Sequence, residues 1–190
     1  MIRGFTGEPV VGPIRGYRWW RVTPDGWLES PWFSHTRWLT DWNVAECRSP
    51  GRRVLRRGWR RRHPRGVPGR GCGCGFYGLH LVPGPDDCAG KLWEMDPSTW
   101  SGAKGFVFGV VSAWGRVLIG TEGWRAERCQ PIALYIPPGS RIGSDGRLPL
   151  LLSHYRAAAI SSLDELIGEW APQRLDALLG TPASATWRAT

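Results

Sequence analysis

Residues 105–136 place the strongest constraint on the fold of this chain. Residues 106–119 are mostly apolar, residues 120–123 read Gly-Thr-Glu-Gly, and residues 124–136 are mostly apolar again. Two long strand-like runs around a glycine-rich turn are typical of antiparallel pairing, so we expect two or three antiparallel strands here. Gly109 and Gly115 lie inside the first run and are predicted to mark bulges where a curved sheet bends.

A second strand-like region lies near the N-terminus. Residues 17–22 are aromatic and β-branched, residues 23–26 have turn chemistry, and Trp27-Leu28 resumes the apolar pattern, which predicts a hairpin. Residues 31–43 have no clean period, and we expect irregular structure there. Residues 84–104 are predicted to form an exposed connection. The pattern as a whole favours a curved antiparallel sheet or a small, partly open β-barrel.

The pattern becomes helical toward the C-terminus. Residues 150–160 are predicted to form a helix. Ser162 and Glu165 have the spacing of a capping box in front of a further helix, which Pro172 is expected to end. A last short helix is expected over residues 175–179.

These elements predict an α+β fold. With 190 residues the chain is long enough for one compact domain with a short appendage. We expect a β-rich core over residues 1–137, which contains an arginine-rich loop at residues 48–71, and a helical appendage over residues 138–190.

The arginine-rich loop is flanked by cysteines. Ten arginines and no acidic residue lie between Arg48 and Arg70, and repeated glycine and proline break any long helix. Because cysteine and histidine are the ligands that Zn²⁺ prefers, the segment suggests a structural zinc site. The predicted ligands are Cys47, His63, Cys72 and Cys74.

A different arrangement of these cysteines is the alternative. Cys72 and Cys74 on one strand would point to opposite faces, with Cys74 buried as a small apolar residue and His63 solvated. His80, Cys88 and Cys129 are possible substitutes for His63, although Cys129 lies in a predicted strand and is expected to be buried in the core.

The charge pattern favours binding to nucleic acid. The formal net charge is +9, and guanidinium groups pair bidentately with phosphate. A tryptophan within the cluster could stack on a base. The candidate nucleic-acid-binding residues are Arg52, Arg53, Arg56, Arg57, Trp59, Arg60, Arg61 and Arg62. The alternative is a solvated basic loop that reflects a GC-rich gene.

Candidate catalytic groups are few. Ser153 precedes His154 directly, and neighbouring residues usually point in different directions. Glu127 is expected to form a surface ion pair with Arg125. Residues 66–75 lack the lysine and hydroxyl residue of a phosphate-binding loop. We therefore expect a protein without catalytic activity. The second hypothesis is a host-directed protein-interaction module that uses a tryptophan-rich surface around residues 32–42 and the C-terminal helix.

The sequence also predicts a compartment. The N-terminus lacks a secretory signal, and the longest apolar runs are far shorter than the ~20 residues that span a bilayer. We expect a cytoplasmic protein without membrane contact, in which the five cysteines are thiols or metal ligands rather than disulfides.

Several short motifs occur together in a recognisable order. They are Cys47, His63-Pro64, Cys72-Gly73-Cys74-Gly75-Phe76-Tyr77, Trp114-Gly115-Arg116-Val117 and Gly123-Trp124-Arg125-Ala126-Glu127. This set resembles a group of small actinobacterial and actinophage proteins, over roughly residues 17–136. The resemblance implies a bacterial cell or a phage gene as the source, and implies no particular activity. The long arginine-rich segment, and Thr121 where histidine is expected, depart from the group.

Overall fold

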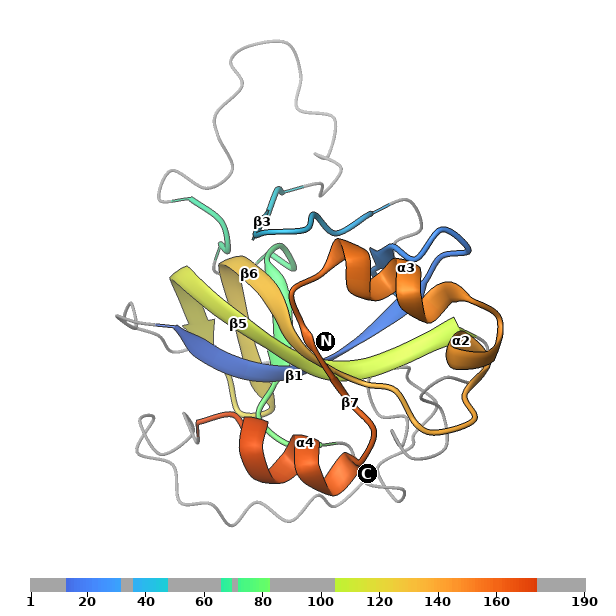
Figure 1. Ribbon diagram of the computed structural model, residues 1–190. Helices are drawn as coiled ribbons and strands as arrows, with labels where there is room; N and C mark the ends of the chain where they lie inside the picture. The colour runs from blue at the N-terminus through green and yellow to red at the C-terminus, as the bar shows by residue number, and fades with distance from the viewer. Residues whose placement is uncertain (1–12, 32–35, 48–65, 70–71, 83–104, 174–190) are drawn as a thin grey trace, which may run out of the picture.

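The computed structural model describes residues 13–31, 36–47, 66–69, 72–82 and 105–173 (Figure 1). It confirms the predicted α+β class, with a mostly antiparallel seven-stranded sheet and helices near the C-terminus. The strands are β1 (Ile14–Val22), β2 (Leu28–Glu29), β3 (Asn43–Val44), β4 (Phe76–Leu79), β5 (Phe106–Ile119), β6 (Gly123–Tyr135) and β7 (Ala158–Ile160). The helices are α2 (Arg141–Ser144), α3 (Arg147–His154) and α4 (Leu163–Trp170).

The predicted antiparallel strands of residues 105–136 are confirmed as β5 and β6. The register shifts between Trp114 and Val117, where Gly115 has a φ of +79°, so the bulge predicted at Gly115 is present. A second register shift lies next to Gly109, between Val110 and Val111, whereas Gly109 itself stays in register. It pairs directly with Leu134, and a Cβ there would collide with the carbonyl oxygen of Ala133, so this glycine permits close approach of β6.

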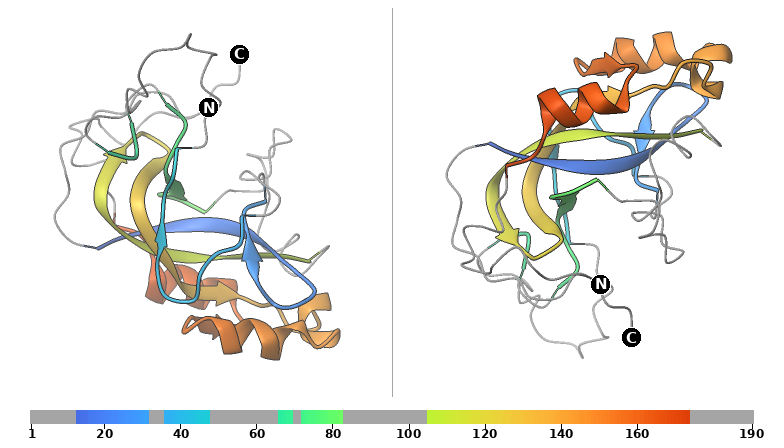
Figure 2. Two further views of the ribbon diagram at one scale, coloured as in Figure 1. Left: turned by 90° about the horizontal axis from the view of Figure 1, so that it is seen from above. Right: turned by 90° about the horizontal axis from the view of Figure 1, so that it is seen from below.

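Four strands form a closed cycle of hydrogen-bonded pairs. β1 pairs with β5 and β4, and β6 pairs with the same two strands. The N-terminal hairpin is confirmed, because β2 pairs antiparallel with the end of β1. In Figure 2 the helix α4 lies on one side of β1 and β5, whereas β4 lies on the other side.

Trp124 fills the space inside this cycle. A Cβ added at Gly16 of β1 would lie 2.6 Å from its indole ring, and a Cβ at Gly78 of β4 would also collide with it. The fully buried indole therefore needs glycine on two strands. Its Nε1–H donates to the carbonyl of Arg15 at 3.0 Å, which satisfies the one polar atom of the ring.

The apolar side chains form two clusters. The larger contains Trp20, Leu28, Trp38 and Trp124 and extends to the α2–α3 region through Ile142 and Leu151. The smaller lies on the opposite side of β1 and β5. It contains Tyr17, Trp19, Phe108, Val110, Ala133, Tyr135, Ile160 and Leu166, so that β7 and α4 cover this side of the sheet.

The C-terminal elements differ in part from the prediction. Residues 150–160 are not one helix, because α3 ends at His154 and residues 158–160 form β7, which pairs in parallel with β6. Backbone groups along the edge of β6 thus override the local helical preference. The N-cap at Ser162 is confirmed, because its hydroxyl accepts from the Glu165 N–H at 3.4 Å at the start of α4. The helix predicted over residues 175–179 and the connection over residues 84–104 lie outside the described residues.

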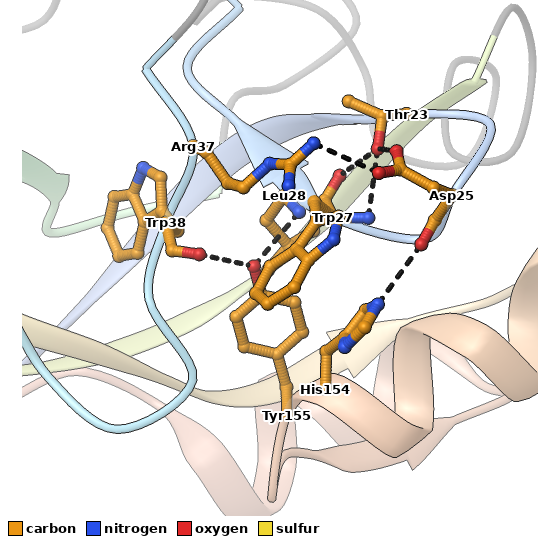
Figure 3. Close-up of polar contacts among 8 residues, drawn as sticks. All are labelled: Thr23, Asp25, Trp27, Leu28, Arg37, Trp38, His154 and Tyr155. Atoms are coloured by element: carbon orange, nitrogen blue, oxygen red, sulfur yellow. Dashed lines mark hydrogen bonds and ion pairs between the residues drawn. The ribbon is translucent and has the colours of Figure 1, made fainter.

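Aromatic and hydroxyl contacts hold the end of α3 against the hairpin (Figure 3). The rings of Trp27 and His154 stack with centroids 3.8 Å apart. The Tyr155 hydroxyl donates to the carbonyl of Trp38 at 2.8 Å and accepts from the Leu28 N–H at 3.0 Å. One side chain therefore satisfies two backbone groups from separate segments.

Within the described part of the chain, no helix is long and apolar enough to cross a membrane.

Replacing Trp124 with alanine should destabilise the protein by about 3–5 kcal/mol, because the void between two glycine-bearing strands cannot easily collapse. Urea unfolding measures this change. Trp42→Ala is the matched control, since this tryptophan is 45% exposed and should cost less than about 1 kcal/mol. Equal losses in the two variants would contradict the role assigned to Trp124.

Tyr155→Phe should cost about 1–3 kcal/mol, because the Leu28 N–H loses its acceptor. Burial raises the pKa of Tyr155 to about 12. A raised pKa in the folded state means that the stabilisation is complete below the unfolded value of about 10 and is lost as the pH rises toward 12. Chemical unfolding at pH 8 and at pH 11 should therefore show the difference between the two proteins shrink. A variant as stable as the parent at pH 8 would refute this.

Candidate metal centre

The strands β3 and β4 lie end to end along one edge of β6. β5 occupies the other edge of β6 along most of its length. β3 pairs with β6 as far as Arg128, and the Ala45 N–H then donates to the carbonyl of Glu127 at 2.7 Å. β4 begins with Phe76 opposite Ala126, the next residue of β6. The chain thus leaves this edge after residue 45 and returns to the same place at residue 76.

Three cysteines lie where the two strand ends meet. The sulfur atoms of Cys47, Cys72 and Cys74 are all within 4.8 Å of one another, and the Cys47 and Cys72 sulfurs are 3.7 Å apart. With a Zn–S bond of ~2.3 Å, two thiolates on one tetrahedral zinc ion are roughly 3.8 Å apart. The three thiols are not joined in disulfides. This cluster can therefore hold a metal ion.

The three thiols differ in their surroundings. Cys74 is buried, whereas Cys47 and Cys72 are partly exposed. Burial raises the pKa of Cys74 to about 11, and the Gly69 N–H, which donates to the Cys74 sulfur at 3.3 Å, acts in the opposite direction. A metal ion must displace the Cys74 proton, so metal binding releases protons and weakens as the pH falls.

A buried arginine lies beneath the cysteine turn. The guanidinium of Arg125 donates to the carbonyl oxygens of Cys72, Cys74 at 2.9 Å, and Gly69 at 3.4 Å. Arg125 is 2% exposed, so the predicted surface ion pair with Glu127 is wrong. The sequence does contain a signal for this role. Trp124 and Ala126 point into the core, so the alternation of a strand turns Arg125 to the opposite face, where β4 brings the cysteine turn.

The structure brings together three of the four predicted metal ligands. Cys47, Cys72 and Cys74 are adjacent, and His63 lies outside the described residues. The alternative with Cys72 and Cys74 on opposite faces of a strand is wrong, because both residues precede β4 and their sulfurs converge.

The predicted substitutes for His63 are not part of this cluster where they are described. Cys129 is fully buried in the larger apolar cluster, as expected. His80 is buried, and its Nε2 lies 3.0 Å from the carbonyl oxygen of Gly120. Cys88 lies outside the described residues. Among the residues that the structure describes, no other histidine, cysteine and carboxylate groups converge in a set of three.

The predicted nucleic-acid-binding residues lie in the segment that the structure leaves undescribed. These are Arg52, Arg53, Arg56, Arg57, Trp59, Arg60, Arg61 and Arg62. What the structure does fix is the position of both ends of this segment, at Cys47 and Cys72.

Ser153 and His154 engage separate partners. The Ser153 hydroxyl donates to the carbonyl of Leu150 at 2.7 Å, whereas the His154 ring stacks on Trp27. The fold thus uses the two side chains in different local contacts.

Comparisons of the chain with protein-family models, curated proteins and solved structures find no match.

Cys72→Ser should abolish stoichiometric metal binding, because it removes a soft thiolate from the centre of the cluster. Purified protein is measured by elemental analysis and by titration with Zn²⁺ against a chromophoric chelator. The parent should hold one equivalent and Cys72→Ser none. The control is Cys129→Ala, which should bind like the parent because Cys129 is buried outside the cluster. Absence of bound metal in the parent would contradict the assignment of a metal centre.

Proposed function

We propose that this chain is a non-catalytic nucleic-acid-binding protein. A structural zinc ion, held by Cys47, Cys72 and Cys74 with His63 as fourth ligand, closes an arginine-rich loop whose side chains bind phosphates. The observation that carries the proposal is the junction of β3 and β4, where the Cys47 and Cys72 sulfurs lie 3.7 Å apart at the two ends of this segment.

The choice of zinc rests on the chemistry of the ligands. Three thiolates and an imidazole form a soft donor set, and four protein ligands satisfy a tetrahedral ion completely. Such an ion has no open position for water or substrate and serves a structural role. Here it would hold together two strand ends that are already adjacent.

The distribution of charge supports phosphate as the ligand. The whole chain has a net charge of +9, whereas residues 48–70 alone contain ten arginines and no acidic residue. The rest of the chain is therefore close to neutral, and the positive charge is concentrated in one segment. Concentrated arginine neutralises several phosphates and releases their counterions, which makes binding strongly dependent on salt.

A protein partner is the second candidate, and one observation favours it. Leu39, Trp42 and Val44 are 61%, 45% and 50% exposed, and they precede Cys47 closely in the chain. Trp38, which belongs to the predicted tryptophan-rich surface, is nevertheless buried, and residues 32–35 of that surface lie outside the described residues. The binding affinity of an apolar interface of this kind should change little with salt concentration.

The test compares two variants that lower the net charge equally. Arg60→Ala with Arg61→Ala removes two arginines from the proposed loop, whereas Arg141→Ala with Arg156→Ala removes two exposed arginines near α2 and α3. Fluorescence anisotropy of labelled duplex DNA, single-stranded DNA and RNA is measured at several salt concentrations. The plot of log affinity against log salt should lose a slope of ~0.9 for each duplex phosphate contact removed, or ~0.7 for single strands.

We expect this loss of slope in the loop variant alone. A variant with Arg56, Arg57, Arg60, Arg61 and Arg62 all changed to alanine should bind none of the three nucleic acids while keeping the parent's circular dichroism. Equal effects of the two double variants would mean that the binding is unspecific charge attraction. No binding by the parent at low salt would reject nucleic acid as the partner.

A further inference from the structure

We propose that Arg125 is the positioning residue of the metal centre, and that it assembles the cysteine turn before any metal binds. The turn consists of residues 69 and 72–75 of the described chain. This inference rests on the proposed metal site, and it adds which side chain outside the ligand set determines the affinity of that site.

The carbonyl groups of the turn converge on two side chains. The guanidinium of Arg125 donates to three of them, those of Gly69, Cys72 and Cys74. The hydroxyl of Tyr77 donates to the fourth, that of Gly73, at 2.7 Å. Each of these four hydrogen bonds joins two groups of the protein and involves no metal ion. The backbone path of the turn is therefore held in place without help from an ion.

The backbone of the turn also places an N–H group against a cysteine sulfur atom. The Gly69 N–H points to Cys74, and the Cys72 N–H closes the turn onto the Gly69 carbonyl at 3.3 Å. Carbonyl groups face Arg125 while the thiols of Cys72 and Cys74 converge on Cys47. Fixing the carbonyls thus also fixes the directions from which the two thiols approach a metal ion.

Close packing places the turn directly on the strand that carries Arg125. Gly75 has a φ of +112°, and a Cβ there would lie 2.9 Å from the Cβ of Pro68 and 3.3 Å from that of Arg125. Arg125 itself is fixed between two strands, opposite Tyr77 on β4 and Leu118 on β5. Its side chain therefore extends from a rigid part of the sheet.

Arginine suits this position for two reasons. Its planar guanidinium has five donors in a fixed fork, which can serve three separate carbonyls, whereas lysine carries its donors on one atom. Its charge is also permanent. Three thiolates around a divalent ion leave a net negative charge, and a nearby buried cation favours that state.

The chain contains a matched control. Arg18 is also buried, at 7% exposure; it donates to the carbonyl of Tyr77 at 2.6 Å and lies over the Trp38 ring at 4.8 Å. These two partners, Tyr77 and Trp38, lie outside the turn, so the Arg18 variant distinguishes loss of a buried arginine from loss of the hydrogen bonds that support the turn.

The first experiment measures metal affinity in Arg125→Gln, Arg125→Lys and Arg18→Gln by competition with a chromophoric chelator. Loss of a group that orients metal ligands typically lowers affinity 10–100-fold, and we expect this for both Arg125 variants. Arg18→Gln should keep the parent's affinity even if it unfolds more easily. The Co²⁺-loaded proteins add a second readout, since the absorption bands of thiolate-bound Co²⁺ should change in the Arg125 variants alone.

The second experiment needs no metal. In a Cys88→Ser background, the metal-free proteins are treated with a thiol-bridging bimane, and the Cys47–Cys72 bridge is quantified by mass spectrometry. Loss of even one hydrogen bond to a charged donor is worth about tenfold in an equilibrium, and Arg125 makes three to the turn, so Arg125→Gln should bridge at least about tenfold more slowly than the parent. Arg18→Gln should bridge at the parent's rate.

The outcomes separate the two proposals. If the parent binds no metal but the Arg125 variants still bridge more slowly than the parent, the zinc site is rejected and the preassembled turn is retained. Metal binding and bridging that are equal in Arg125→Gln and the parent would overturn the role of Arg125. So would equal losses in Arg125→Gln and Arg18→Gln. If Arg125→Gln does not fold, Arg125→Lys carries the comparison, because it retains the buried charge and removes the fork.

Discussion

The structure depends on the placement of one indole ring. Trp124 can lie inside the four-strand cycle only because β1 and β4 have glycine where they face it, at Gly16 and Gly78. A side chain at either position would force the strands apart and would open the cycle. The close approach of β4 to β6 follows from this packing, and the cysteine turn precedes β4 directly. The geometry of the cysteine cluster is thus a consequence of how the core is filled.

Neighbouring residues on β6 serve the core and the site from opposite faces of one strand. Trp124 points into the core, and Arg125 points to the cysteine turn. The edge of β6 also explains how a long basic segment is tolerated. β3 and β4 follow one another along this edge, so residues 46–75 depart from and return to nearly one point. Because the fold already brings the two ends of this loop together, a longer loop raises the entropic cost of loop closure only slightly.

Local patterns in the sequence predicted local structure well. The β5–β6 pair, the hairpin and the cap of α4 each depend on residues that are close in the chain, and all three are confirmed. Cys47, Cys72 and Cys74 were predicted as metal ligands from the chemistry of their thiols, and their sulfur atoms do converge. Features that depend on distant pairing were missed. Residues 158–160 form a strand only because the edge of β6 is available, and Arg125 was assigned to the surface because β4 and the turn approach it from far along the chain.

We propose that a metal ion at the cysteine cluster makes the arginine-rich segment a phosphate-binding surface. The most direct test is the affinity of one preparation for labelled nucleic acid before metal removal, after removal, and after restoration with Zn²⁺. Circular dichroism verifies that the sheet remains folded throughout. Removal of the metal should weaken binding to nucleic acid, and restoration should recover it. Binding that is the same in all three states, with the fold intact, would contradict it.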